Sequence, residues 1–248
     1  MVLKHFFPFF LFSSFILTLG CEKETPQQTA DDEEELCLAD PTYVSFQSQI
    51  DEASDGDTVM VDPGTYEGSL DFKGKNIVVG SMYLSSGDTS YIHQTIIDAK
   101  GSGSVVRFSN NEGRNAVLSG FTLTGGSAVK GGGIYIQNAS PTLDHLVVKN
   151  NKTANCEVDD FFSGGEGAGI YLEASDALLT NILIKENTSS IQGGGMFIGA
   201  TSKPELKRVH IYNNSAANYG GGMHFASAEA DLFQVACQAN ESEKGAGL

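Results

Sequence analysis

The stretch Gly131-Gly-Gly-Ile-Tyr-Ile136 recurs along the chain, and its recurrence decides the fold. Related glycine-rich segments begin at residues 167, 193, 220 and 245, at intervals of 36, 26, 27 and 25 residues. A second motif, Leu146-Val-Val-Lys-Asn-Asn151, returns in phase at residues 182, 209 and 235. The sequence is therefore built largely from a unit of about 26 residues, with one insertion of about ten residues between positions 152 and 165.

Within each unit, apolar and polar residues alternate with a period of two, and no segment keeps a helical period. A short unit made of strands and Gly/Asn turns fits one coil of a β-solenoid, in which each strand pairs in parallel with its copy in the next coil. The crossover between such strands is expected to be right-handed. We therefore predict an all-β, single-stranded right-handed parallel β-helix over residues 43–248, with a short capping helix near residue 50.

Asparagine occupies the same place in four successive units. An Asn at a turn tolerates the left-handed backbone conformation, and its amide can hydrogen-bond the neighbouring coil. The sequence thus predicts a structural asparagine ladder formed by Asn151, Asn187, Asn214 and Asn240.

One column of aromatic residues is expected on the outer surface, because its neighbours in each strand are apolar and should point inward. It consists of Tyr135, Tyr171, Phe197 and His224. Rings one coil apart, about 4.8 Å along the axis, would present flat faces on which sugar rings can stack. The alternative is an aromatic ladder that only stabilises strand pairing.

Acidic residues suggest two places for Ca²⁺, whose ligands are oxygens. One is the insertion, with Glu157, Asp159 and Asp160; the other is the pair Glu205 and Asp231, at equivalent positions of neighbouring units and beside a lysine. The plainer alternatives are a surface loop and a surface charge pair. We predict no catalytic residue, because no column of acid and base side chains emerges from the repeat.

The first residues carry the features of an export signal. Residues 1–20 place Lys4 and His5 before an apolar run that is too short to span a membrane. Leu17-Thr18-Leu19-Gly20-Cys21 resembles a bacterial lipobox, which implies lipid attachment at Cys21. Thr18 departs from the usual aliphatic residue, so ordinary signal-peptide cleavage is the alternative. Residues 21–42 are polar and acidic and are predicted to form a tether.

The other cysteines are Cys37, Cys156 and Cys237, an odd number that allows one disulfide without specifying the pair. At the other end of the chain, Gly245-Ala-Gly-Leu248 begins a further unit without a capping segment. We therefore expect these residues to belong to a longer polypeptide.

The net charge is −16, from 15 basic and 31 acidic residues. A nucleic-acid backbone is not expected as a partner, because its binding requires a basic surface.

The entry segment and the repeats resemble a known family. The residues Gly56-Asp-Thr-Val59 and Pro63-Gly-Thr-Tyr66, followed by Thr95-Ile-Ile-Asp98, resemble right-handed parallel β-helix proteins of the pectin-lyase-like superfamily. The Gly-Gly-Gly-Ile and x-x-Asn repeats resemble those of chlamydial polymorphic outer-membrane proteins. The resemblance implies a fold rather than an activity, because the superfamily includes lyases, hydrolases, esterases and adhesins.

These observations lead to one main expectation about function. It is a non-catalytic bacterial envelope protein, exported and anchored in the outer membrane by lipid, whose β-helix binds polysaccharides or cell-surface glycans. One alternative is a Ca²⁺-dependent polysaccharide lyase. The other is a passive stalk for a domain beyond Leu248.

Overall fold

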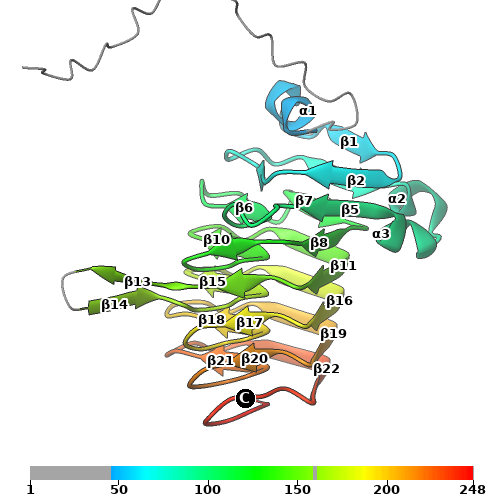
Figure 1. Cartoon of the computed structure of the whole chain (residues 1–248). Coiled ribbons are helices and arrows are strands. Elements are labelled where there is room, and N and C mark those ends of the chain that lie inside the picture. Colours follow the sequence, from blue (N-terminus) through cyan, green and yellow to red (C-terminus); the bar gives the residue numbers. More distant parts are fainter. Residues whose placement is uncertain (1–45, 159–160, 248) are drawn as a thin grey trace, which may run out of the picture. The chain divides into compact units, whose positions relative to one another are not determined.

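The structure is a computed structural model that describes residues 46–158 and 161–247 (Figure 1). The leader, Cys21, the tether and Cys37 lie outside these residues, as do Asp159 and Asp160. The side chains of Cys156 and Glu157 also lie outside the description. What the sequence predicts for all of them stays a prediction.

The described chain winds through a stack of coils whose strands form three parallel sheets (Figure 1). The first sheet consists of β1 (Thr58–Val61), β2 (Gly64–Glu67), β4 (Val78–Ser81), β5 (Thr95–Asp98), β7 (Val117–Ser119), β8 (Thr122–Thr124), β11 (Thr142–Lys149), β16 (Leu178–Lys185), β19 (Glu205–Tyr212) and β22 (Asp231–Gln238). The second consists of β3 (Leu70–Asp71), β6 (Val106–Phe108), β10 (Ile134–Gln137), β15 (Ile170–Glu173), β18 (Met196–Ile198) and β21 (Met223–Phe225). The third consists of β9 (Ser127–Ala128), β12 (Lys152–Thr153), β17 (Thr188–Ser189) and β20 (Ser215–Ala216).

Strand pairing follows the register of the sequence repeats. Leu143 on β11 lies opposite Leu179 on β16, which in turn lies opposite Leu206 on β19. All three are fully buried, as expected for side chains that point into the coil. The prediction of a mainly β structure with parallel strands in register from coil to coil is confirmed.

The hydrogen bonds predicted for the asparagine ladder are present. Its four side chains are buried, and each Oδ1 of Asn187, Asn214 and Asn240 accepts a hydrogen bond from the backbone N–H of the ladder asparagine one coil earlier, at 2.9–3.0 Å. Each Nδ2 donates to a backbone carbonyl of the preceding coil, as from Asn187 to Val148 at 3.0 Å. The ladder thus satisfies buried polar groups where the chain turns.

The left-handed conformation predicted for the ladder asparagines belongs to the residue before each of them. Positive φ angles of 50–56° occur at Asn150, Glu186, Asn213 and Ala239. That part of the prediction is wrong, because the turn requires its left-handed residue one position earlier and leaves the ladder asparagine free to point into the coil.

Helix α1 (Gln47–Glu52) lies at one end of the stack, which confirms the predicted cap (Figure 1). Its Ile50 is completely buried, and Lys75 donates from Nζ to the carbonyls of Ile50, Asp51 and Ala53 at 2.6–2.7 Å. The helix therefore covers the apolar end and has its last carbonyls satisfied.

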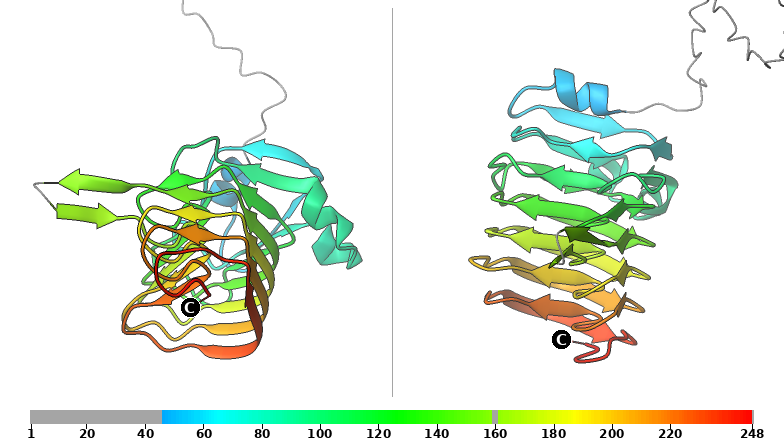
Figure 2. Two further views of the ribbon diagram at one scale, coloured as in Figure 1. Left: turned by 60° about the horizontal axis from the view of Figure 1, so that its bottom comes forward. Right: turned by 60° about the vertical axis from the view of Figure 1, so that its left-hand side comes forward.

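Helices α2 (Tyr83–Ser86) and α3 (Ser90–Gln94) form a projection between β4 and β5, on the side of the stack (Figure 2). The projection packs closely on the outer face of the first sheet, since a Cβ atom at Gly80 would lie 2.7 Å from Leu84 Cδ2. Within residues 46–158 and 161–247, no helix is long and apolar enough to cross a membrane.

The insertion in the repeat forms an antiparallel hairpin, β13 (Asn155–Val158) and β14 (Phe161–Gly164), that protrudes from the stack (Figures 1 and 2). The sequence had indicated only a loop at this place. Because the two strands pair with each other, the insertion leaves the coils before and after it in register.

Candidate functional site

The aromatic column predicted from the repeat exists, and we call Tyr135, Tyr171, Phe197 and His224 the ring ladder. Successive ring centroids lie 5.4, 5.2 and 5.7 Å apart, with interplanar angles of 8°, 3° and 21°. The parallel register of the second sheet produces this spacing, because each ring sits directly opposite its copy in the next strand.

The ring ladder does not offer free faces to a ligand. Tyr171 is only 1% exposed and Phe197 only 7%. At one end the Arg107 guanidinium lies 4.3 Å from the Tyr135 ring centroid, and at the other the Tyr219 ring lies 6.0 Å from His224. The expectation of exposed ring faces is therefore wrong, since rings one coil apart cover the faces of their neighbours.

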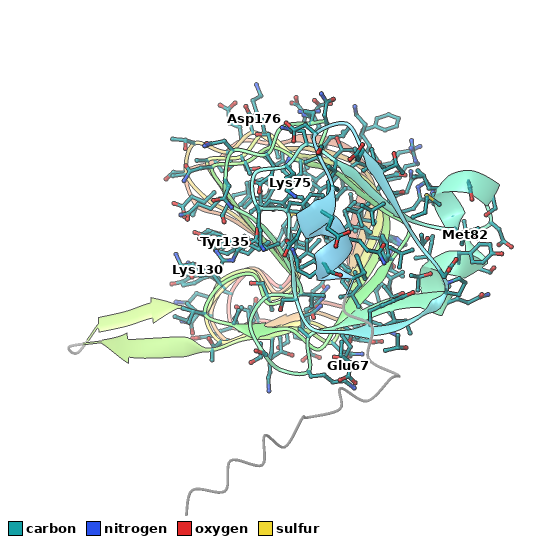
Figure 3. The ribbon with its side chains drawn as sticks, turned by 90° about the horizontal axis from the view of Figure 1, so that it is seen from above. Glu67, Lys75, Met82, Lys130, Tyr135 and Asp176 are labelled. Carbon is teal, nitrogen blue, oxygen red and sulfur yellow. The ribbon has the colours of Figure 1, made fainter. Side chains whose placement is uncertain are left out.

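Charged side chains surround the middle of the ring ladder. Lys130 Nζ lies 3.2 Å from the Tyr171 hydroxyl and 3.8 Å from Glu166 Oε2, and Tyr171 donates a short hydrogen bond to Glu173 (Figure 3 shows Lys130 and Tyr135 on the same side of the stack). Burial raises the pKa of Glu166, and burial together with the Glu173 carboxylate raises the pKa of Tyr171. These contacts enclose the rings further.

In the acidic pair predicted as a Ca²⁺ site, Glu205 is already paired with two cations. Glu205 and Asp231 lie opposite each other in the register of β19 and β22. However, Glu205 accepts from Arg114 at 2.9 Å and from Lys207 at 2.8 Å, and these bonds lower its pKa. Among the described side chains, no three His, Cys, Asp or Glu residues come together as metal ligands. The pair therefore has the character of a surface ion network.

Cys237 points inward and packs against the core as a free thiol, as the alternation of β22 predicts. Burial raises its pKa, so the thiol is kept protonated.

A polar cluster that the sequence did not predict lies where the first sheet bends. We call Tyr83, Asp144, His145, Thr180, Asn181 and Arg208 the corner cluster. The long strands β11, β16 and β19 each bend at a left-handed residue, and these residues are His145, Asn181 and Arg208, with φ angles of 48–56°. Three polar side chains thereby occupy equivalent corners of successive coils, and Tyr83 reaches them from α2.

Hydrogen bonds connect the centre of the corner cluster into a chain. The Tyr83 hydroxyl lies 2.9 Å from His145 Nε2, and His145 Nδ1 lies 2.7 Å from Asp144 Oδ2. The rings of Tyr83 and His145 are also in contact, with centroids 4.4 Å apart. The side chains of His145 and Asp144 are 24% and 27% exposed, so the chain is half-buried but accessible.

Further donors hold the Asp144 carboxylate in place. Its Oδ1 accepts from the Thr180 hydroxyl at 2.6 Å and from Asn181 Nδ2 at 3.0 Å. Arg208 Nε in turn donates to Asn181 Oδ1 at 2.6 Å. Burial tends to raise the pKa of Asp144, but the hydrogen bonds from Thr180, His145 and Asn181 outweigh it, so the pKa lies below its usual value.

These contacts fix the proton positions in the chain. The ionised Asp144 can only accept, so His145 donates to it from Nδ1; in the neutral imidazole, Nε2 is then the acceptor for the Tyr83 proton. Burial and the Asp144 charge raise the pKa of Tyr83, so the phenol is neutral. A carboxylate, an imidazole and a hydroxyl in this order are the arrangement in which a base can activate a hydroxyl group.

The sequence contained only part of the signal for this cluster. Asp144 occupies an outward position of the repeat, and His145 follows it directly. Tyr83 belongs to the projection between β4 and β5, which has no counterpart in the other coils within residues 46–158 and 161–247, so no repeat places it. The left-handed backbone is not a signal either, because Gln234 has the same conformation at the next corner, with φ 55°.

Comparison with known proteins identifies no relative of the chain. No family model matches the sequence, and no curated protein or solved structure matches it significantly.

Proposed function

We propose that this protein is an exported bacterial surface protein whose right-handed parallel β-helix binds glycans at the corner cluster. The handedness follows from the general rule that crossovers between parallel strands of one sheet are right-handed. The binding site differs from the one expected from sequence, because the ring faces are covered.

The observation that supports binding is the composition of the accessible corner. Tyr83 and His145 supply an aromatic surface, and Asn181 and Arg208 place amide and guanidinium groups one and two coils further along. A few fixed polar groups beside aromatic rings are typical of sites that recognise polar ligands. Each is held by a neighbour within the cluster, so little conformational entropy is lost on binding.

Export and anchoring are the second part of the proposal. They rest on the apolar run of residues 1–20 and on Cys21 after Leu-Thr-Leu-Gly. Lipid attachment at Cys21 would hold the β-helix at the outer membrane through the acidic tether 21–42. Replacing Cys21 with Ala should release the protein from the membrane fraction of cells that express the full chain.

The binding proposal is tested with the chain lacking its leader, passed over immobilised neutral and acidic polysaccharides with and without Ca²⁺. We expect retention on at least one polymer and, for Arg208→Ala, about tenfold weaker binding, since a charge-assisted hydrogen bond contributes about 1.5 kcal/mol. Lys203→Ala is the matched control, because Lys203 is an exposed cation on the same coil outside the cluster.

The other outcomes lead to different functions. Retention that Arg208→Ala and Lys203→Ala weaken equally would place binding elsewhere on the surface. Release of unsaturated sugar products that stops on chelation would favour the Ca²⁺-dependent lyase. Absence of retention on every polymer would leave the passive stalk.

A further inference from the structure

We infer that Tyr83, His145 and Asp144 form a nucleophilic triad in which the Tyr83 hydroxyl accepts acyl groups from aryl esters. This activity goes beyond glycan binding. It uses the same corner of the molecule, but it requires no retention on a polysaccharide.

The geometry meets the two distance requirements of such a triad. The nucleophilic oxygen lies 2.9 Å from the base nitrogen, and the other ring nitrogen lies 2.7 Å from the carboxylate. Both distances are within hydrogen-bond reach in the resting state. Asp144 is held by Thr180 and Asn181 as well as by His145, so it orients the imidazole rather than moving with it.

The position of Tyr83 is also fixed. Its backbone N–H donates to Ser81 Oγ at 3.2 Å, and its ring lies against the imidazole at an angle of 32°. Helix α2 that carries it is packed against Gly80 and Gly120 of the sheet, where a side chain would not fit. A fixed hydroxyl beside an oriented base gives the proximity on which intramolecular catalysis depends.

The reaction balances with the groups present. As the Tyr83 oxygen attacks the ester carbonyl carbon, its proton passes to His145 Nε2, and Asp144 stabilises the imidazolium. The ester C–O bond then breaks, and the leaving phenol takes the proton from His145. Water attacks the acyl-tyrosine with His145 as base, the carboxylic acid leaves, and the proton returns to Tyr83.

The ester class follows from the acidity of the nucleophile. Tyrosine has an ordinary pKa near 10, and although burial raises the pKa of Tyr83, its oxygen is that of a phenol and not of an alkyl alcohol. Transfer of an acyl group from an aryl ester to Tyr83 is therefore nearly balanced in free energy. Transfer from an alkyl ester is strongly uphill, which makes aryl esters the substrates that this triad can use.

The test uses the leaderless chain and 4-nitrophenyl acetate, with release of 4-nitrophenolate followed by absorbance and the acetylated tyrosine found by peptide mass mapping. We expect Tyr83 to be acetylated about 100-fold faster than Tyr91, because a general base contributes 10²–10⁴-fold. Tyr91 is an internal control on α3 of the same projection. Among the described residues, its hydroxyl donates no hydrogen bond to a histidine, in contrast to that of Tyr83.

Three variants separate the triad from a structural contact. Tyr83→Phe, which has no hydroxyl to acetylate, should lower the release of 4-nitrophenolate, and His145→Gln and Asp144→Asn should each reduce the rate of Tyr83 acetylation at least tenfold. Glutamine suits this corner, since Gln234 has the same conformation at the equivalent place. Thermal unfolding of each variant verifies that it is folded.

Two results would overturn the inference. One is acetylation of Tyr83 no faster than that of Tyr91, and the other is an unchanged Tyr83 rate in folded His145→Gln. Either would make the Tyr83–His145 bond a clamp that holds α2 against the sheet. Polysaccharide retention is measured on the same samples, so failure of the triad and failure of glycan binding are distinguishable.

Discussion

At the scale of single residues, the asparagine ladder is the feature with the clearest energetic consequence. Replacing Asn187 with Ala removes the acceptor of the buried Asn151 N–H and the donor to the Val148 carbonyl. We expect a loss of about 1–3 kcal/mol in the free energy of unfolding, because buried polar groups are left unpaired. Denaturant unfolding monitored by circular dichroism measures it.

The control for this prediction is Asn218→Ala, at an exposed position outside the ladder. It should change stability by no more than about 0.5 kcal/mol. Equal unfolding midpoints for the wild type and Asn187→Ala would show that the ladder bonds contribute nothing net.

Two half-buried carboxylates, Asp144 and Glu166, have opposite effects on how the folding stability of this protein depends on pH. Asp144 has a lowered pKa, so its contribution to stability is present above the unfolded value near 3.9 and is lost as the pH falls through the folded value. Glu166 has a raised pKa, and its Oε2 is buried without a hydrogen bond. Ionised Glu166 therefore opposes folding, and its cost disappears once the pH falls below its unfolded value near 4.3.

We accordingly expect Glu166→Gln to raise the free energy of unfolding at pH 7, by about 1 kcal/mol, because the raised pKa indicates that the cost of burying the charge exceeds its attraction to Lys130, 3.8 Å away. The gain should shrink as the pH falls and vanish below about pH 4, where the wild-type carboxyl is protonated in both states. Thermal unfolding of both proteins from pH 3 to 8 measures the difference. A gain that is the same at every pH would contradict the electrostatic explanation.

At this scale the sequence predicts which residues form the ladder better than it predicts their backbone conformation. The recurrence of Asn at one place in the repeat was sufficient to find all four ladder residues. It could not show which residue of the turn is left-handed, because Asn150, Glu186, Asn213 and Ala239 share no residue type. The requirement is set by how the strands meet at the turn, which only the folded coil reveals.

At the scale of strands and helices, the alternation of apolar and polar residues predicts whether a side chain points inward or outward. It does not predict whether an outward side chain is covered by its neighbours. It placed the ring ladder correctly on the outer side of the second sheet. The alternation could not show that Lys130, in the turn before β10, lies over the Tyr171 ring of the next coil. Nor could it show that neighbouring rings cover one another's faces. For the same reason Asp144 was visible as an outward residue, while its contact with Tyr83 depends on a projection that occurs once.

Helix α1 covers the apolar end of the stack, and its contribution to stability can be tested. Ile50→Ala should lower the stability by about 2–4 kcal/mol, since the side chain is fully buried at the end of the core. The effect should be local, because each coil of a solenoid contacts only its neighbours. Hydrogen exchange should accelerate in β1 and β4 before it changes in β19.

The matched variant is Gln49→Ala, which alters an exposed residue of the same helix. It should leave exchange in β1 and β4 unchanged. Uniform acceleration over all strands in Ile50→Ala would mean that the described chain unfolds as one unit instead of coil by coil.

At the scale of the whole molecule, stability is close to a sum over coils and the contacts between them. The contact between the coils of β10 and β15 lies near the middle of the described chain. Gly133 lies directly at this contact, because a Cβ atom there would lie closest to the Gly169 carbonyl oxygen of the next coil, and 2.6 Å from Val148 Cγ1 and 2.9 Å from Asn151 Nδ2 of its own coil. Its neighbours are a backbone carbonyl, a core side chain and a ladder amide, so none of them can move away at low cost.

Gly133→Ala should therefore lower the free energy of unfolding by about 1–3 kcal/mol. In addition, it should weaken the coupling between the coils before and after this point. We expect denaturant unfolding to broaden or to split into two transitions, because the two parts of the stack would then unfold at different concentrations. Gly64→Ala is the control, since a Cβ atom at Gly64 makes only ordinary contacts of 3.5 Å or more. A single sharp transition at a lower midpoint in Gly133→Ala would show that cooperativity extends across the contact, and that the stack is held together more tightly than a chain of nearest neighbours.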